Sequence, residues 1–137
     1  MSPADAARLQ DAFRRESTSL LRYARAAAPY AAGADKKLRT DLFRAGDEAA
    51  AAVDALGGFL ESHRVPVPPP GAFPAVFTDL NCVAVGYIFP KVAADRAAAS
   101  VALEADLAAL TDPSARAALQ PLLDLARRHR DSLAGGM

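Results

Sequence analysis

Glu16 is the residue whose position points most directly to chemistry. It lies on the apolar stripe of a long predicted helix, because apolar residues recur around it at steps of three and four, the spacing of one helical face. The apolar residues on this face are Leu9, Phe13, Leu20, Tyr23 and Ala27. A carboxylate on such a face points into the core, where burial without a partner is unfavourable. Glu16 therefore needs a metal ion, a hydrogen-bond partner or a proton.

Several groups could satisfy Glu16 by hydrogen bonding. The candidates in the sequence are Tyr87, Asn81 and Tyr23, and a buried water or the carboxyl group's own proton are further alternatives. His129 also lies on an apolar stripe, near the end of the chain. It is expected to be a core histidine or one that complements the dipole at a helix C-terminus.

The other residues capable of chemistry form no recognised pattern. Cys82 lies in an apolar run and is expected to be a small buried hydrophobe, since no base is spaced to activate it as a nucleophile. His63 is expected at the end of the second helix, far from His129. The sequence has no Cys-x-x-Cys-His, no phosphate-binding glycine loop and no His-Glu-x-x-His.

Four amphipathic helices are predicted to position these residues. Their expected ranges are about 3–28, 36–63, 74–110 and 113–135, with Ser2 and Asp112 as helix-starting residues. Pro90 is expected to kink the third helix. The proline-rich segment 65–71 predicts a stiff, extended crossover between the second and third helices. This order predicts one all-α domain over residues 1–137, a four-helix bundle with the ferritin-like arrangement.

The first helix resembles that of the rubrerythrin branch of the ferritin-like superfamily. The resemblance rests on Phe13, Glu16 and Ser17, followed by Arg22-Tyr23. Two weaker matches are Phe89-Pro90 in the third helix and Phe59-Leu60-Glu61 near the end of the second. The resemblance implies that Glu16 occupies the position of a di-iron ligand.

The same resemblance implies that most of the other ligands have been lost. The family's ligand positions on the second and third helices fall on Ala49, Ala52, Asn81 and Ala84, and the glutamate position on the fourth falls on Ala126. The imidazole of the fourth helix is retained at His129. Glu16 and His129 are thus the candidate metal ligands, and two protein ligands are too few to hold two irons in the usual way.

Composition excludes several functional classes. Lys plus Arg and Asp plus Glu both number 16, so the chain lacks the basic excess typical of a nucleic-acid binder. A lone cysteine cannot form an intramolecular disulfide, which favours a reducing compartment. No signal-peptide pattern opens the sequence, and no apolar run is long enough to span a bilayer. A soluble cytoplasmic protein with no membrane partner is expected.

The expected function is that of a binding or assembly module that has lost di-iron catalysis, which predicts a protein that purifies without stoichiometric iron and has no ferroxidase or peroxidase activity. One alternative is an unconventional metal-binding or redox protein that holds iron or manganese through Glu16 and His129. Another is a carrier of a small apolar ligand in the alanine-lined core. A homodimer is also predicted, because Leu21, Phe43 and Leu60 fall outside the main stripes and need cover from the crossover or from a second subunit.

Overall fold

Every extended element of secondary structure in the described residues is a helix, and Tyr30 and Ala84 form one isolated parallel β-bridge. The structure is a computed structural model, and it describes residues 1–69 and 71–135. The elements are α1 (Pro3–Ser17), α2 (Leu20–Ala27), α3 (Asp35–Ser62), the short 3-10 helix η1 (Ala75–Leu80), α4 (Val85–Ala109) and α5 (Pro113–Gly135). The predicted all-α class is confirmed. Within the described ranges, no helix has the length and apolar character needed to cross a membrane.

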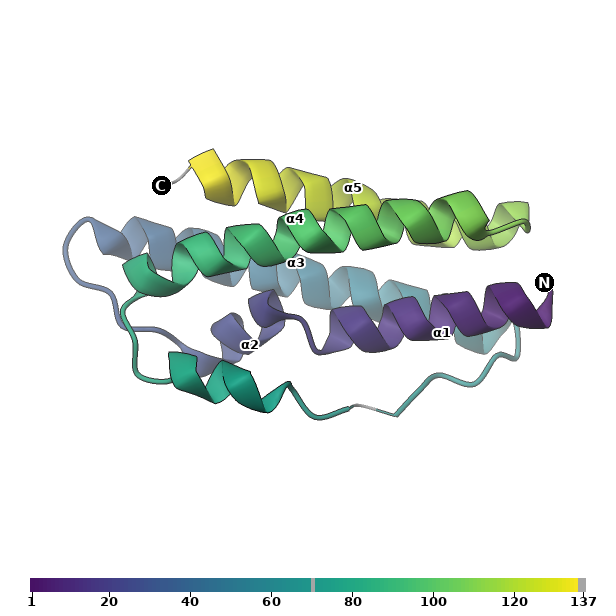
Figure 1. Cartoon of the computed structure of the whole chain (residues 1–137), viewed down its shortest axis with the longest axis horizontal. Coiled ribbons are helices and arrows are strands. Elements are labelled where there is room, and N and C mark those ends of the chain that lie inside the picture. Colours follow the sequence, from purple (N-terminus) through teal and green to yellow (C-terminus); the bar gives the residue numbers. More distant parts are fainter. Residues whose placement is uncertain (70, 136–137) are drawn as a thin grey trace.

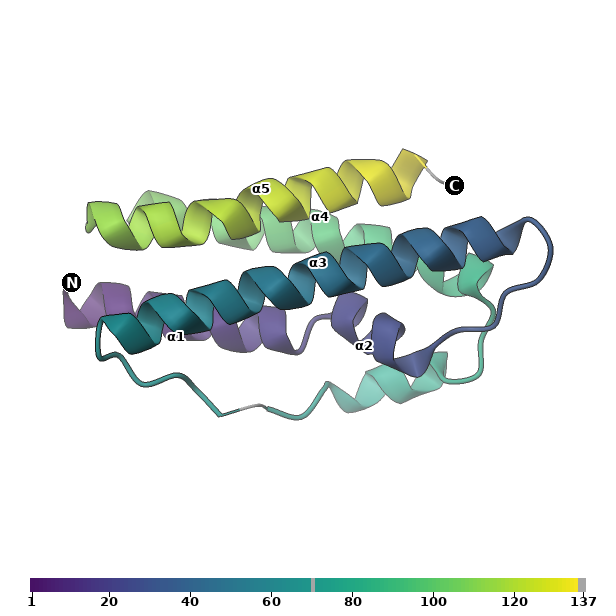
Figure 2. The ribbon, with the colours of Figure 1, turned by 180° about the vertical axis from the view of Figure 1, so that it is seen from behind.

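The long helices lie lengthwise beside one another. Figure 1 shows α4 and α5 running along α3, while α1 and α2 follow one another along the same direction. The reverse view in Figure 2 shows the same arrangement. The connection between α3 and η1 runs back along the molecule on the side of α1 and α2, and brings the chain to the end where α4 begins. Residue 70, within the proline-rich segment, lies outside the described residues.

Side-chain caps begin three of the helices. The Ser2 hydroxyl accepts a hydrogen bond from the Asp5 amide at 3.1 Å, and the Asp112 carboxylate accepts one from the Ala115 amide at 2.9 Å. These caps satisfy amides that have no partner within the helix. The predicted starting residues of the first and last helices are confirmed. Ser19 caps α2 in the same way, by accepting from the Arg22 amide at 3.3 Å.

The predicted helix over 3–28 is wrong in one respect, because the chain breaks at Thr18 into α1 and α2. Three consecutive hydroxyl residues explain the break, since their side chains compete for backbone groups. Ser17 Oγ donates to the Phe13 carbonyl at 2.6 Å, and Thr18 Oγ1 donates to the Arg14 carbonyl at 3.1 Å. Ser19 then begins a new helix as its N-cap.

The predicted third helix also begins later than expected. The chain forms η1 and then a turn, and α4 starts only at Val85. Backbone bonds to Tyr30 stabilise this turn, since the Tyr30 amide donates to the Val83 carbonyl at 3.3 Å and the Val85 amide donates to the Tyr30 carbonyl at 2.8 Å. Cys82 lies in the turn with a φ of 61° and is exposed, so the expectation that it is buried is wrong. Pro90 lies inside α4, which continues through it.

The apolar residues outside the main stripes do not form an exposed face. Leu21 and Leu60 are fully buried. Val65 and Val67 of the connection pack against the cluster that contains Leu60. Phe43 is partly buried, with the Arg25 guanidinium 4.1 Å from its ring centroid. The reason given for a homodimer therefore no longer holds, and the dimer itself stays a prediction.

Candidate functional site

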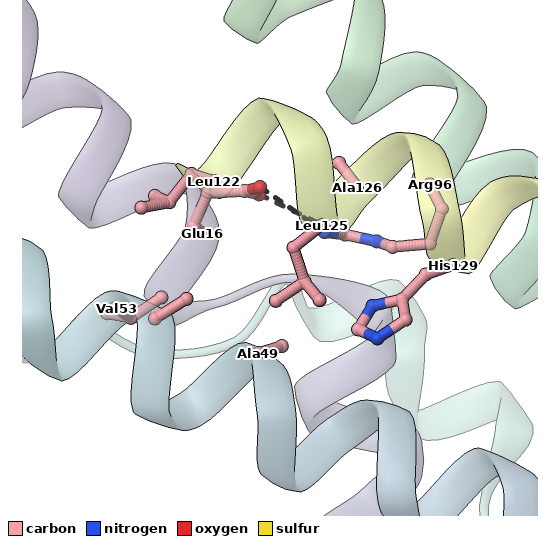
Figure 3. Close-up of a pocket in the computed structure, with 9 residues that line it drawn as sticks. Glu16, Ala49, Val53, Arg96, Leu122, Leu125, Ala126 and His129 are labelled. Carbon is pink, nitrogen blue, oxygen red and sulfur yellow. Dashed lines mark hydrogen bonds and ion pairs between the residues drawn. The ribbon is translucent and has the colours of Figure 1, made fainter. Parts of the chain in front are cut away.

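Glu16 is buried and its partner is Arg96. Arg96 Nη1 and Nη2, from α4, donate to Glu16 Oε1 and Oε2 at 3.2 and 3.4 Å. Only 6% of Glu16 and 4% of Arg96 are exposed to solvent. Figure 3 shows the two side chains pointing toward one another across the interior. The buried carboxylate predicted from helical spacing is thus satisfied by a charged group on a distant helix.

The side-chain partners predicted for Glu16 were wrong. The Tyr23 hydroxyl donates to the Asn81 side-chain oxygen, which pairs these two residues with each other. Tyr87 is 58% exposed and lies against Lys91 on the surface. Asn81 precedes α4 because that helix starts late, so it lies at one end of the long helices.

Arg96 is held by a second carboxylate. Its Nε and Nη2 donate to Asp95 Oδ2 at 2.9 and 2.7 Å. Burial acts to lower the pKa of Arg96, but the carboxylates of Glu16 and Asp95 outweigh it and raise that pKa. Arg96 is therefore a permanent cation, which two carboxylates hold at the middle of the fold.

His129 lies beside this ion pair and belongs to α5. Its Nε2 is 3.3 Å from Glu48 Oε1, and Arg128 Nη2 donates to Glu48 Oε2 at 2.8 Å. Burial lowers the pKa of His129, and the nearby Glu48 carboxylate only partly opposes this effect. The imidazole is therefore neutral at neutral pH. Its Nδ1 has no hydrogen-bond partner among the described residues.

Glu16, Arg96 and His129 line one small cavity between the helices (Figure 3). The remaining lining residues are Ala49, Ala52, Val53, Leu122, Leu125 and Ala126. Its free volume is about 10 Å³, which corresponds to about one water molecule. The two candidate metal ligands therefore do meet at one place. A small apolar ligand would find no room in this cavity.

A wider groove opens on the other side of the ion pair. Its volume is about 360 Å³, and Glu16, Arg96 and Asp95 contribute to its lining. The remaining residues that line it are Arg15, Thr18, Ser19, Pro74, Phe77, Ala98, Ala99 and Ala102. The buried pair thus separates the small inner cavity from a groove with apolar walls and charged groups.

The residues around Glu16 do not fit a di-iron centre. Residues 1–69 and 71–135 contain no group of three or more His, Cys, Asp or Glu side chains close enough to share a metal ion. Of the positions at which the family resemblance expected ligands, Ala49, Ala52 and Ala126 line the cavity and offer no ligand atom. A guanidinium group faces Glu16 and repels any added cation.

Arg96 is the buried charged residue of the candidate site that the sequence analysis missed, although the sequence contains a signal for it. Arg96 follows Phe89 and Val92 and precedes Leu103 at helical steps, so it lies on the buried stripe of α4. This is the same criterion that identified Glu16.

Comparison of the chain with protein-family models, with curated proteins and with solved structures finds no match.

Proposed function

We propose that the chain is a ferritin-like four-helix bundle that performs no di-iron catalysis and acts as a binding or assembly module. The observation that supports this proposal is the Glu16–Arg96 ion pair. In the family that the first helix resembles, the carboxylate at this position ligates a metal cation. Here the positive charge comes from the guanidinium of Arg96, whose Nη1 lies 3.2 Å from Glu16 Oε1.

The order and direction of the helices favour this assignment. If α1 and α2 are counted as one interrupted helix, the four long elements are joined by a short, a long and a short connection. The long connection returns the chain along the molecule before α4 (Figure 1). One long crossover between the second and third helices is the feature that distinguishes ferritin-like bundles from simple up-and-down ones.

The ion pair makes metal binding at Glu16 unfavourable in two ways. A metal ion would have to displace Arg96, which would leave a buried guanidinium with Asp95 as its remaining partner. It would also find few ligands, since His129 is the other group on this cavity that could ligate it. Iron and manganese both require several oxygen or nitrogen ligands.

The groove outside the ion pair is the place where such a module can bind a small molecule or a peptide segment. It combines the aromatic ring of Phe77 and three alanines of α4 with the charged groups of Asp95 and Arg15. Apolar walls with a few convergent polar groups are typical of sites for small molecules or peptide segments.

Metal analysis of the purified protein tests this proposal. The protein is expressed with iron and manganese supplied, alongside Glu16→Ala and the matched surface variant Glu61→Ala. We expect well under one metal ion per chain in all three proteins, and no ferroxidase or peroxidase activity. One or more iron or manganese ions per chain, lost in Glu16→Ala and retained in Glu61→Ala, would refute the proposal.

A further inference from the structure

Within the part of the chain that the structure describes, the buried Nδ1 of His129 lacks the hydrogen-bond partner that a buried polar atom normally has. The residue is 4% exposed, and its ring lines the cavity beside the ion pair. Among the side chains in the described ranges, Nδ1 is the one fully buried polar atom without a hydrogen-bond partner. Buried polar groups are normally paired with protein or with ordered water. A nitrogen that lines a cavity is the group that an internal water molecule would satisfy.

We propose that this cavity binds a single water molecule, which bridges His129 Nδ1 to the Glu16–Arg96 ion pair. The site is independent of the proposed function, because it requires neither a metal nor an external partner. It assigns one occupant to the cavity and one tautomer to His129.

The groups on either side of the cavity determine how this water is bound. Nε2 of His129 faces the carboxylate of Glu48, and an ionised carboxylate can only accept hydrogen bonds. The ring therefore carries its hydrogen on Nε2, and Nδ1 has a free lone pair. The neutral state of the ring, which follows from its burial, agrees with this assignment. The water donates one hydrogen to Nδ1.

Arg96 and Glu16 complete the binding of the water. A guanidinium has five N–H donors, and Arg96 uses Nε, both hydrogens of Nη2 and one of Nη1 on Asp95 and Glu16. Within the described part of the chain, one Nη1 hydrogen is left to donate to the water oxygen. The second water hydrogen is donated to the Glu16 carboxylate. Three hydrogen bonds are the usual number for a buried water.

The size and charge of the cavity favour water over other occupants. A free volume of about 10 Å³ admits one water and nothing larger. The two charged groups that line the cavity, Glu16 and Arg96, are already paired with each other and their charges cancel. A neutral occupant that both donates and accepts hydrogen bonds suits this environment, whereas an ion would be left without a counter-charge.

The bridge would join side chains from four helices into one polar network. Glu16 comes from α1, Glu48 from α3, Arg96 from α4 and His129 from α5. Without the water, these side chains form two separate groups, one of Glu48 with His129 and Arg128 and the other of Arg96 with Glu16 and Asp95. The water molecule connects them across the core.

Solution NMR of the isotope-labelled wild-type protein tests the tautomer and the water together. Long-range proton–nitrogen correlations are expected to show the Nε2–H tautomer for His129. Water-selective nuclear Overhauser spectra are expected to show a long-lived water beside the methyl group of Ala126, which lines the cavity. An Nδ1–H tautomer, or the absence of this water signal, would overturn the proposal. A metal ion bound in the cavity would overturn it as well.

Two matched variants test whether His129 holds the water. His129→Phe keeps an aromatic ring but removes both nitrogens, and His63→Phe makes the same change at an exposed histidine. We expect the water signal at Ala126 to be lost in His129→Phe and kept in His63→Phe. Persistence of the signal in a folded His129→Phe would refute the bridge. If that variant does not fold, the wild-type tautomer and water signal still decide the question.

Discussion

Replacing Arg96 by methionine should destabilise the protein more than most single substitutions. Methionine retains an unbranched apolar side chain but removes the guanidinium. Both hydrogen bonds that Glu16 accepts within the described part of the chain come from Arg96, so the variant leaves an unpaired buried carboxylate. Breaking a buried ion pair in this way typically costs about 3–5 kcal/mol. Single domains are stable by only about 5–15 kcal/mol, so this loss is a large fraction of the total.

The size of the effect depends on which partner is removed. Glu16→Leu leaves Arg96 bound to Asp95 at 2.7 and 2.9 Å. We therefore expect a smaller loss, at the lower end of the range, about 3 kcal/mol. The double variant Glu16→Leu/Arg96→Met removes both buried charges. Its stability should lie within about 1 kcal/mol of the wild type or above it, because apolar replacements of buried ion pairs are often neutral or stabilising.

Urea unfolding followed by far-UV circular dichroism measures these differences. At about 4 °C per kcal/mol, Arg96→Met should also lower the melting temperature by roughly 12–20 °C. The reasoning is refuted if Arg96→Met is as stable as the wild type. It is also refuted if the double variant is as unstable as Arg96→Met, because the loss would then not come from an unpaired charge.

Three further predictions concern the titration and packing of other residues. Burial lowers the pKa of His129 below its usual value of about 6.5, so at mildly acidic pH this residue binds more protons in the unfolded chain than in the folded one. The free energy of unfolding should therefore fall as the pH drops below about 6.5. His129→Gln should remove this contribution to the pH dependence of the free energy of unfolding. The backbone amide of Asp112 lowers the pKa of Asp5, so ionised Asp5 stabilises the fold at pH values above the pKa that it has in the unfolded chain. Asp5→Asn should therefore lower the free energy of unfolding that urea denaturation measures at about pH 7. The difference between variant and wild type should shrink as the pH falls below about 4. A Cβ at Gly46 would lie 2.7 Å from Arg25 Cβ, so Gly46→Ala should lose about 1–3 kcal/mol. Nothing lies within 4 Å of a Cβ at Gly58, so Gly58→Ala in the same helix should gain about 0.5–1 kcal/mol through helix propensity; equal effects of the two glycine variants would contradict the close approach of α2 to α3.

Helical periodicity identified two of the buried residues of the candidate site. It placed Glu16 and His129 on buried faces, and both are buried in the structure. It did not identify the partner of Glu16, because Arg96 lies 80 residues away along the chain. The periodicity of α4 does place Arg96 on its buried stripe, but the neighbouring charge of Asp95 in an alanine-rich segment gives the stretch the character of a solvated helix face. The pairing of charged residues across a core depends on the axial position of each helix and on its rotation about its own axis. The apolar pattern of a single helix does not contain that information.

The helix boundaries that differed from the prediction share another cause. At Ser19 and at Cys82 the chain is not helical, in spite of a favourable apolar pattern on both sides, because other hydrogen bonds replace those of the helix. Ser19 captures the Arg22 amide, and the turn around Cys82 is stabilised by backbone bonds to Tyr30, which lies far away in the sequence. Apolar periodicity reports which residues face the core. It is insensitive to a single turn whose hydrogen bonds come from a side chain or from a distant segment.

The buried polar groups have a physical consequence for how the helices align. Apolar side chains tolerate a shift of one helix along another, because a methyl group that leaves one apolar neighbour meets a similar one a turn further on. The hydrogen bonds of Arg96 with Glu16 and of His129 with Glu48 do not tolerate such a shift, since a displacement of one turn would leave a buried charge or ring nitrogen unpaired. The penalty for an unpaired buried charge is several kcal/mol, comparable with the whole stability of a small domain. We infer that these pairs contribute less to stability than to fixing one alignment of α1, α3, α4 and α5.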